Sequence, residues 1–167
     1  ILTNARLIDP EAGTDTLGAV RIENGKIAEI LPASSEGIDC KGKYLAPGII
    51  DIGVKIGEPG ERHKESFRTA GLAAAAGGVT TMVTRPDTTP AIDTPEILDF
   101  FRRRAADAAP VNVLPMAALT KGRDGKEMAE IGFLQDAGAV AFSDADRPVT
   151  NAKTLQRILT YATATNA

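Results

Sequence analysis

The feature that most limits the fold of this 167-residue chain is an alternation of apolar and helix-like segments that begins at Leu45. Residues 45–54 are mostly apolar, which is typical of a strand buried on both faces. Strand–helix units joined by short loops predict a parallel α/β sheet. The expected strands are 45–54, 79–84, 111–119 and 139–142, and the expected helices are 64–76, 97–109, 124–137 and 151–165.

Residues 1–44 have a different pattern, with short strand-like segments separated by turns. Segments 1–8, 19–23 and 26–31 are expected strands, and Asn24-Gly25 between the last two is a hairpin turn signal. We therefore predict two domains. Residues 1–44 form a small β-subdomain, and residues 45–167 form four β/α units.

Composition excludes several classes of protein. The formal net charge of −3 argues against a nucleic-acid surface, which would show a basic stripe. No stretch of about 18 apolar residues is present, so no membrane span is expected, and the first residues lack the pattern of a signal peptide. Cys40 is the single cysteine, which excludes an intrachain disulfide. These features predict a cytoplasmic protein.

Four β/α units are half of an eight-fold barrel, and half a barrel leaves open edges and lacks partners for its central layers. We therefore expect the sequence to be the N-terminal part of a longer protein, with the C-terminal half of the barrel absent. A free-standing four-unit sheet is the alternative. A dinucleotide-binding sheet is disfavoured, because no Gly-x-Gly-x-x-Gly follows a strand.

Several short motifs occur in a characteristic order, mostly at strand ends or in the loops that follow strands. They occupy residues 45–51, 58–60, 63–65, 73–81, 86–90, 119–122 and 138–144. In order and spacing the chain resembles the dihydroorotase family of the cyclic amidohydrolases over nearly its whole length. The resemblance implies the N-terminal half of a (β/α)8 TIM-type barrel preceded by a small β-subdomain.

The same resemblance implies a metal site that this chain lacks. Family members end the first barrel strand in Asp-x-His-x-His, and this chain has Asp51, Gly53 and Lys55 in that frame. Glycine has no ligating side chain, and a charged ammonium has no lone pair. We therefore expect no metal cofactor. Asp51 and Asp144 are the residual candidate ligands, the latter at a position where the family commonly has a metal-bridging carboxylate.

The substrate-binding positions that the resemblance implies are also changed. The family arginine that holds the substrate carboxylate corresponds to Gly57, and the family asparagine corresponds to Asp87. An aspartate there is expected to repel the carboxylate of dihydroorotate. Arg85, two residues earlier, is a candidate to hold an anion.

The leading hypothesis is a catalytically inactive dihydroorotase-like protein of pyrimidine biosynthesis. Some family members are inactive partners in the assembly of aspartate carbamoyltransferase, so the resemblance implies a scaffold role in a homo- or hetero-oligomer. One alternative is an active, zinc-dependent cyclic amidohydrolase of dihydroorotase, hydantoinase or allantoinase type with a rearranged site. Another is a small-molecule binding protein.

Lys55 leads to a more specific hypothesis, in which its ammonium occupies the volume that the divalent metal fills in the family's enzymes. A buried charge needs a partner, so we expect Lys55 to pair with Asp51 or Asp144. His63, the single histidine, and Lys121 are expected to be solvated loop residues, and the run 102–104 of three arginines to be a solvated helix face.

Overall fold

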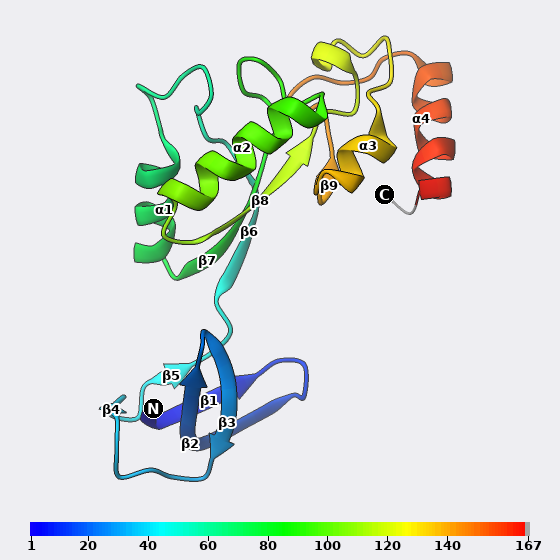
Figure 1. The fold of residues 1–167 in the computed structure, drawn as a ribbon. Coiled ribbons are helices and arrows are strands. Elements are labelled where there is room, and N and C mark those ends of the chain that lie inside the picture. Colours follow the sequence, from blue (N-terminus) through cyan, green and yellow to red (C-terminus); the bar gives the residue numbers. More distant parts are fainter. Residues whose placement is uncertain (166–167) are drawn as a thin grey trace. The chain divides into compact units, whose positions relative to one another are not determined.

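The computed structural model describes residues 1–165, which divide into two compact units between Pro47 and Gly48 (Figure 1). The first unit is a small sheet and the second contains the alternating strands and helices. None of the helices within residues 1–165 is long and apolar enough to cross a membrane.

The first unit is a sheet of order β3-β2-β1-β4, with β5 also paired to β1. β1 and β2 are antiparallel, as are β2 and β3, whereas β4 and β5 run parallel to β1. Asn24 and Gly25 both have positive φ, which confirms the predicted hairpin turn. The strands are β1 (Leu2–Asp9), β2 (Thr14–Glu23), β3 (Lys26–Leu31), β4 (Ile38–Asp39) and β5 (Tyr44–Leu45).

The predicted strand 45–54 is two strands in the structure. Leu45 ends β5 and pairs with Leu7 in the first unit, whereas β6 (Ile49–Val54) opens the second unit. Pro47 has no amide hydrogen to donate to a ladder. A Cβ at Gly48 would lie 2.2 Å from the side chain of Thr80, so the chain needs glycine to enter the second sheet beside β7.

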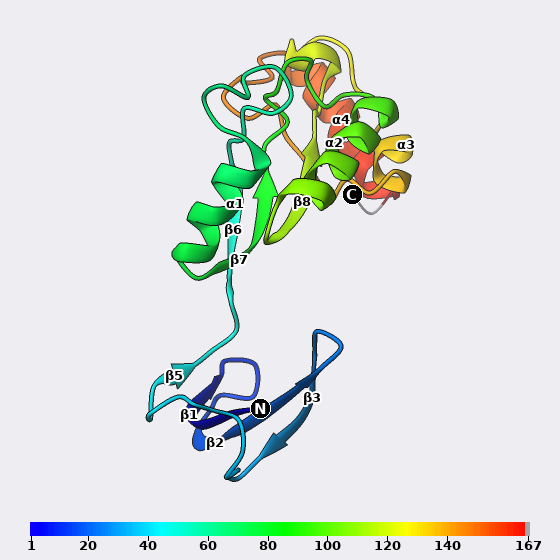
Figure 2. The ribbon, with the colours of Figure 1, turned by 60° about the vertical axis from the view of Figure 1, so that its left-hand side comes forward.

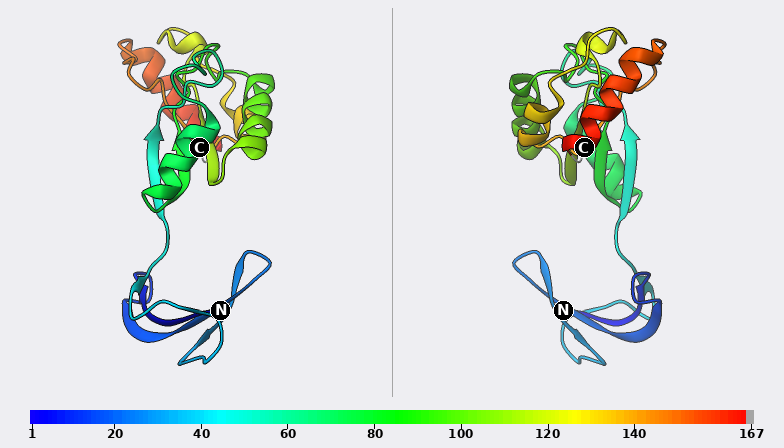
Figure 3. Two further views of the ribbon diagram at one scale, coloured as in Figure 1. Left: turned by 90° about the vertical axis from the view of Figure 1, so that its left-hand side faces the viewer. Right: turned by 90° about the vertical axis from the view of Figure 1, so that its right-hand side faces the viewer.

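The second unit is a parallel sheet of order β6-β7-β8-β9, with strands in chain order (Figure 2). Figure 3 shows β6, in cyan, at the margin of this unit, away from the green helix α2. The further elements are α1 (Phe67–Ala76), β7 (Val79–Thr84), α2 (Pro95–Ala108), β8 (Asn112–Ala117), the 3₁₀ turn η1 (Lys121–Arg123), α3 (Ile131–Asp136), β9 (Ala141–Phe142) and α4 (Ala152–Thr165).

The third helix is much shorter than predicted. Residues 124–130 form a loop whose backbone bonds to the segment after β8, since Lys121 N donates to Glu127 O and Ala129 N to Leu119 O. A bridge between Thr120 and Met128 completes this pairing. Tertiary pairing of this loop, rather than a local preference for helix, decides its structure.

The core of the second unit lies between the sheet and the helices α1 to α3. Phe67 of α1 and Phe101 of α2 are fully buried, and their rings meet edge to face with centroids 4.7 Å apart. Ser66 caps α1, since its hydroxyl accepts from Thr69 N at 3.2 Å, and this cap starts the helix three residues after the predicted position.

Replacing Phe101 with alanine is expected to lower the free energy of unfolding by about 3–5 kcal/mol, because a fully buried aromatic ring is lost. Phe100→Ala, at the neighbouring position with its side chain 48% exposed, is the matched control and should cost much less. Urea unfolding followed by circular dichroism measures both. Equal losses would contradict this description of the core.

Candidate functional site

The carboxyl ends of the four parallel strands meet at one edge of the second unit, where active sites of barrel enzymes lie. Lys55 follows β6, Asp87 follows β7 and Asp144 follows β9, so the chain brings these predicted site residues to a common edge (Figure 1). The loop after β8 contributes Thr120 and Arg123. We refer to this edge as the mouth.

Two glycines, one within β6 and one just after it, have backbone roles at the mouth. Gly53 has φ of +96°, which L side chains rarely adopt, and the β6–β7 register shifts between Ile52 and Val54. A Cβ at Gly57 would lie 2.5 Å from the carbonyl oxygen of Glu61. The backbone therefore disfavours a histidine at Gly53 and leaves no room for an arginine at Gly57.

Lys55 forms an ion pair, but with a different partner from those predicted. Its Nζ lies 3.4 Å from Oδ2 of Asp87, not against Asp51 or Asp144. Arg85 donates to the same oxygen at 2.7 Å. Asp87 was not predicted as the partner, because the predicted partners were the carboxylates of the family's metal site.

The charge of Asp87 is therefore locally compensated. Its side chain is only 4% exposed, and the triad of Lys55, Asp87 and Arg85 has a net charge of +1. Arg85 also has a buried Nε without a hydrogen-bond partner within the described residues. The repulsion expected from Asp87 is thus offset by two cations, and the triad is better suited to an anion than Asp87 alone.

Asp144 is a buried structural carboxylate. Its Oδ1 accepts from the backbone amides of Leu119 and Thr120, each at 2.9 Å, and its Oδ2 accepts from the Thr120 hydroxyl at 2.5 Å. These bonds fasten the loop after β8 to the end of β9. Both oxygens thus accept hydrogen bonds from protein donors, two on Oδ1 and one on Oδ2.

Asp51, the other residual candidate, is exposed within β6. Among residues 1–165, no group of three or more His, Cys, Asp or Glu side chains is placed to hold a metal ion. Zinc needs about four strong donors, so the residues described do not fit the metal that the fold family implies.

Arg123, which is buried beside Asp144, was not predicted from the sequence. Its guanidinium donates to the carbonyl oxygen of Asp144 at 3.0 Å and 3.2 Å and forms an ion pair with Asp146. The backbone amide of Asp146 itself, together with the charges of Arg123 and Arg85, holds the pKa of the Asp146 carboxyl below its usual range. An arginine in a polar loop gives no sequence signal of burial.

Glu58 was also missed as a buried charge. Arg104 donates to its Oε1 at 2.8 Å, and its Oε2 accepts from Phe67 N at 3.3 Å, which ties the loop after β6 to α1 and α2. The hydrogen bond and the charge of Glu58 raise the pKa of Arg104.

Arg102 and Arg103 are exposed, as predicted, and only Arg104 of this run is half-buried. Arg102 donates to Ala137 O at 2.6 Å, and Arg103 pairs with Asp99. His63 is exposed, as predicted. Lys121 pairs with Glu127, whose hydrogen bond and charge raise the Lys121 pKa.

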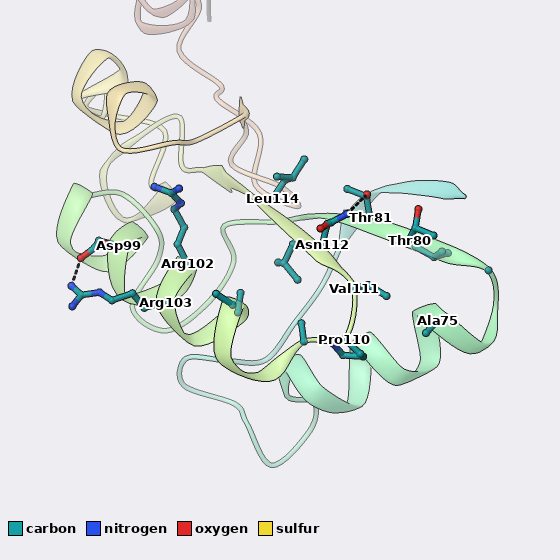
Figure 4. A pocket seen from close by; sticks show the side chains of 16 residues that line it. Ala75, Thr80, Thr81, Asp99, Arg102, Arg103, Pro110, Val111, Asn112 and Leu114 are labelled. Carbon is teal, nitrogen blue, oxygen red and sulfur yellow. Dashed lines mark hydrogen bonds and ion pairs between the residues drawn. The ribbon is translucent and has the colours of Figure 1, made fainter. Parts of the chain in front are cut away.

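A separate hollow lies away from the mouth. It is an open groove of about 1110 Å³ that includes the amino ends of β7 and β8, at Thr80 and Val111, and one side of α2 (Figure 4). Arg102 and Arg103 line it, and both are already engaged. This groove does not contain the mouth residues, so it is not the predicted site.

Comparison with known proteins decides the family. Residues 42–166 match the model of the dihydro-orotase-like family. The chain belongs to this family. It is 40% identical to a dihydroorotase of Solibacter usitatus (strain Ellin6076), over 97% of this chain and 39% of that protein. It is 43% identical to a dihydroorotase of a Wolbachia strain (subsp. Drosophila simulans, wRi), over 96% of this chain and 37% of that protein. The chain thus spans less than half the length of these relatives.

Among solved structures, the fold is similar to that of L-hydantoinase (dihydropyrimidinase) from Arthrobacter aurescens. The TM-score is 0.83 at 24% identity, over 99% of this chain and 38% of that chain. This match confirms the predicted architecture, a small β-subdomain followed by the parallel N-terminal half of a TIM-type barrel.

Replacing Asp144 with alanine is expected to lower the free energy of unfolding by about 2–4 kcal/mol, because the amide of Thr120 and its hydroxyl lose their buried acceptor. Asp107→Ala, at an exposed position of α2, is the control and should change stability by less than about 0.5 kcal/mol. Denaturant titration gives both values. A neutral Asp144→Ala would show that these bonds do not hold the loop.

Proposed function

We propose that this chain belongs to a dihydroorotase-like protein of pyrimidine biosynthesis that does not hydrolyse dihydroorotate. The family match and the relatives named dihydroorotase support the first part. The second part rests on one observation, that the two family histidine positions are Gly53 and Lys55.

Ring opening in this family depends on a metal that lowers the pKa of the attacking water towards neutral. Gly53 offers no ligand atom, Lys55 offers an ammonium that is paired with Asp87, and Asp144 already accepts hydrogen bonds from the loop after β8. The backbone at Gly53 and the crowding at Gly57 extend the change beyond side chains. Restoring the two histidines alone would not restore the family's site.

A scaffold role for aspartate carbamoyltransferase, in a hetero-oligomer, is the third part of the proposal. Subunit contacts use the outer surface of a barrel and do not need a metal. Large apolar side chains are exposed on three helices, at Leu72 of α1, Phe100 of α2 and Phe133 of α3, and such side chains suit protein contacts.

A second candidate function is the binding of a small anion without turnover. The observation that favours it is the triad of Lys55, Asp87 and Arg85, which has a net charge of +1 and a buried Arg85 Nε that has no hydrogen-bond partner among residues 1–165. Thermal stabilisation by dihydroorotate without ring opening would support binding over a purely structural role.

The full-length protein, purified without chelator, is expected to contain far less than one zinc per chain and to open no dihydroorotate ring. Plasma mass spectrometry and a ring-opening assay measure these two quantities on one sample. The dihydroorotase of Solibacter usitatus, purified identically, is the positive control for turnover. Stoichiometric zinc with turnover would overturn the proposal in favour of an active zinc-dependent amidohydrolase.

Mixed with the aspartate carbamoyltransferase of the same organism, the full-length protein is expected to co-elute with it in size-exclusion chromatography. Lys55→Met should leave co-elution unchanged, because the mouth is not the contact surface in this proposal. Separate elution at micromolar concentrations of both proteins would contradict the scaffold role.

A further inference from the structure

Five charged side chains at the mouth alternate in sign and connect the segments after all four strands. Lys55 follows β6, Asp87 and Arg85 follow β7, Asp146 follows β9 and Arg123 follows β8. Lys55 lies 3.4 Å from Asp87, and Arg85 lies 2.7 Å from Asp87 and 3.8 Å from Asp146. Arg123 closes the series by pairing with Asp146. We call this series the charge chain.

We infer that Lys55 is a positioning residue that replaces a divalent cation, because its ammonium links the end of β6 electrostatically to the other three loops through the charge chain. This inference rests on the proposed absence of a metal from the mouth. A metal would join strand ends by accepting lone pairs from several of them. An ammonium joins them by donating hydrogen bonds and by its charge.

Burial shows which members of the charge chain need their partners. The side chains of Asp87 and Arg123 are 4% and 8% exposed, so each would be a costly buried charge if left unpaired. Lys55 and Asp146 are 54% and 65% exposed. The charge chain therefore has exposed and buried members, and each of the two buried charges, Asp87 and Arg123, contacts a charge of opposite sign.

Lys55 is the member that brings β6 into the charge chain. The loops after β8 and β9 are already joined by the bonds of Asp144 to Thr120. Neutral backbone bonds also tie the β6 end to β7, since Arg85 N donates to Val54 O and Thr89 N to Pro59 O. Removing the ammonium should therefore loosen the mouth without unfolding the sheet.

The test is a double-mutant cycle on the full-length protein, with melting temperature as the readout. Lys55→Met is expected to lower the melting temperature by about 2 °C or more, and Asp87→Asn by more, because Asn leaves Lys55 and Arg85 without their shared carboxylate. In the Asp87→Asn background, Lys55→Met should cost nothing or raise the melting temperature. Lys55→Arg should keep the wild-type value, because the charge remains.

The matched control is the exposed pair of Lys126 and Asp124. Its distance of 3.5 Å is similar, but its carboxylate is 44% exposed, so Lys126→Met should shift melting by less than about 0.5 °C. A Lys55→Met variant that melts like Lys126→Met would overturn the inference. The inference would also be overturned if Lys55→Met lowered the melting temperature equally in the wild-type and Asp87→Asn backgrounds. If Asp87→Asn does not fold, the comparison of Lys55→Met with Lys55→Arg tests the inference, since only Lys55→Arg should keep the wild-type melting temperature.

Zinc content of the wild-type sample separates this inference from the proposed function. Zinc with turnover would overturn the proposed absence of a metal, and with it the role of Lys55 as a replacement. A metal-free protein in which Lys55→Met has no effect would overturn the role of Lys55 alone. The proposed inactivity would then stand.

Discussion

One buried carboxylate oxygen, Oδ2 of Asp87, determines the arrangement of the mouth, because it is shared by the cations of Lys55 and Arg85. A charge removed from water must be compensated by opposite charge or by hydrogen bonds. Around Asp144 the compensation is neutral, from two amides and a hydroxyl. Around Asp87 it is cationic. The mouth thus compensates its two buried carboxylates in different ways, Asp144 with neutral donors and Asp87 with cations.

The fold could be predicted largely from local pattern, with failures where distant residues decide. Strand 79–84 and the helix that begins at Pro95 follow the sequence signals closely, because β-branched residues and a helix-start proline act locally. The break at Pro47-Gly48 depends on the approach of Thr80, and the short α3 depends on a loop that pairs with residues after β8. The Pro-Gly pair is a local signal of the break, but the loop pairing that shortens α3 has no signature within its own segment.

The candidate site, too, could be predicted only in part from the sequence. The sequence alone showed that Gly53, Lys55 and Gly57 replace the two histidines and the arginine of the family motif, because the motif fixes their positions. The backbone consequences of these replacements could not be predicted, since the positive φ of Gly53 and the crowding at Gly57 arise only in the folded backbone. Arg123 and Glu58 are ordinary loop charges in the sequence, and their burial arises only when the loops meet.

The changes at the mouth are interdependent. A histidine at Lys55 would remove one cation from Asp87 and leave Arg85 as its sole charged partner. An arginine at Gly57 would have to displace the carbonyl of Glu61, in the loop that Glu58 fastens to Arg104. Each reversion thus conflicts with a contact made by a neighbour. The residues at the former histidine and arginine positions and the ion pairs around Asp87 are therefore mutually dependent, and under the proposed function charge pairing takes the place of metal coordination in holding the loops.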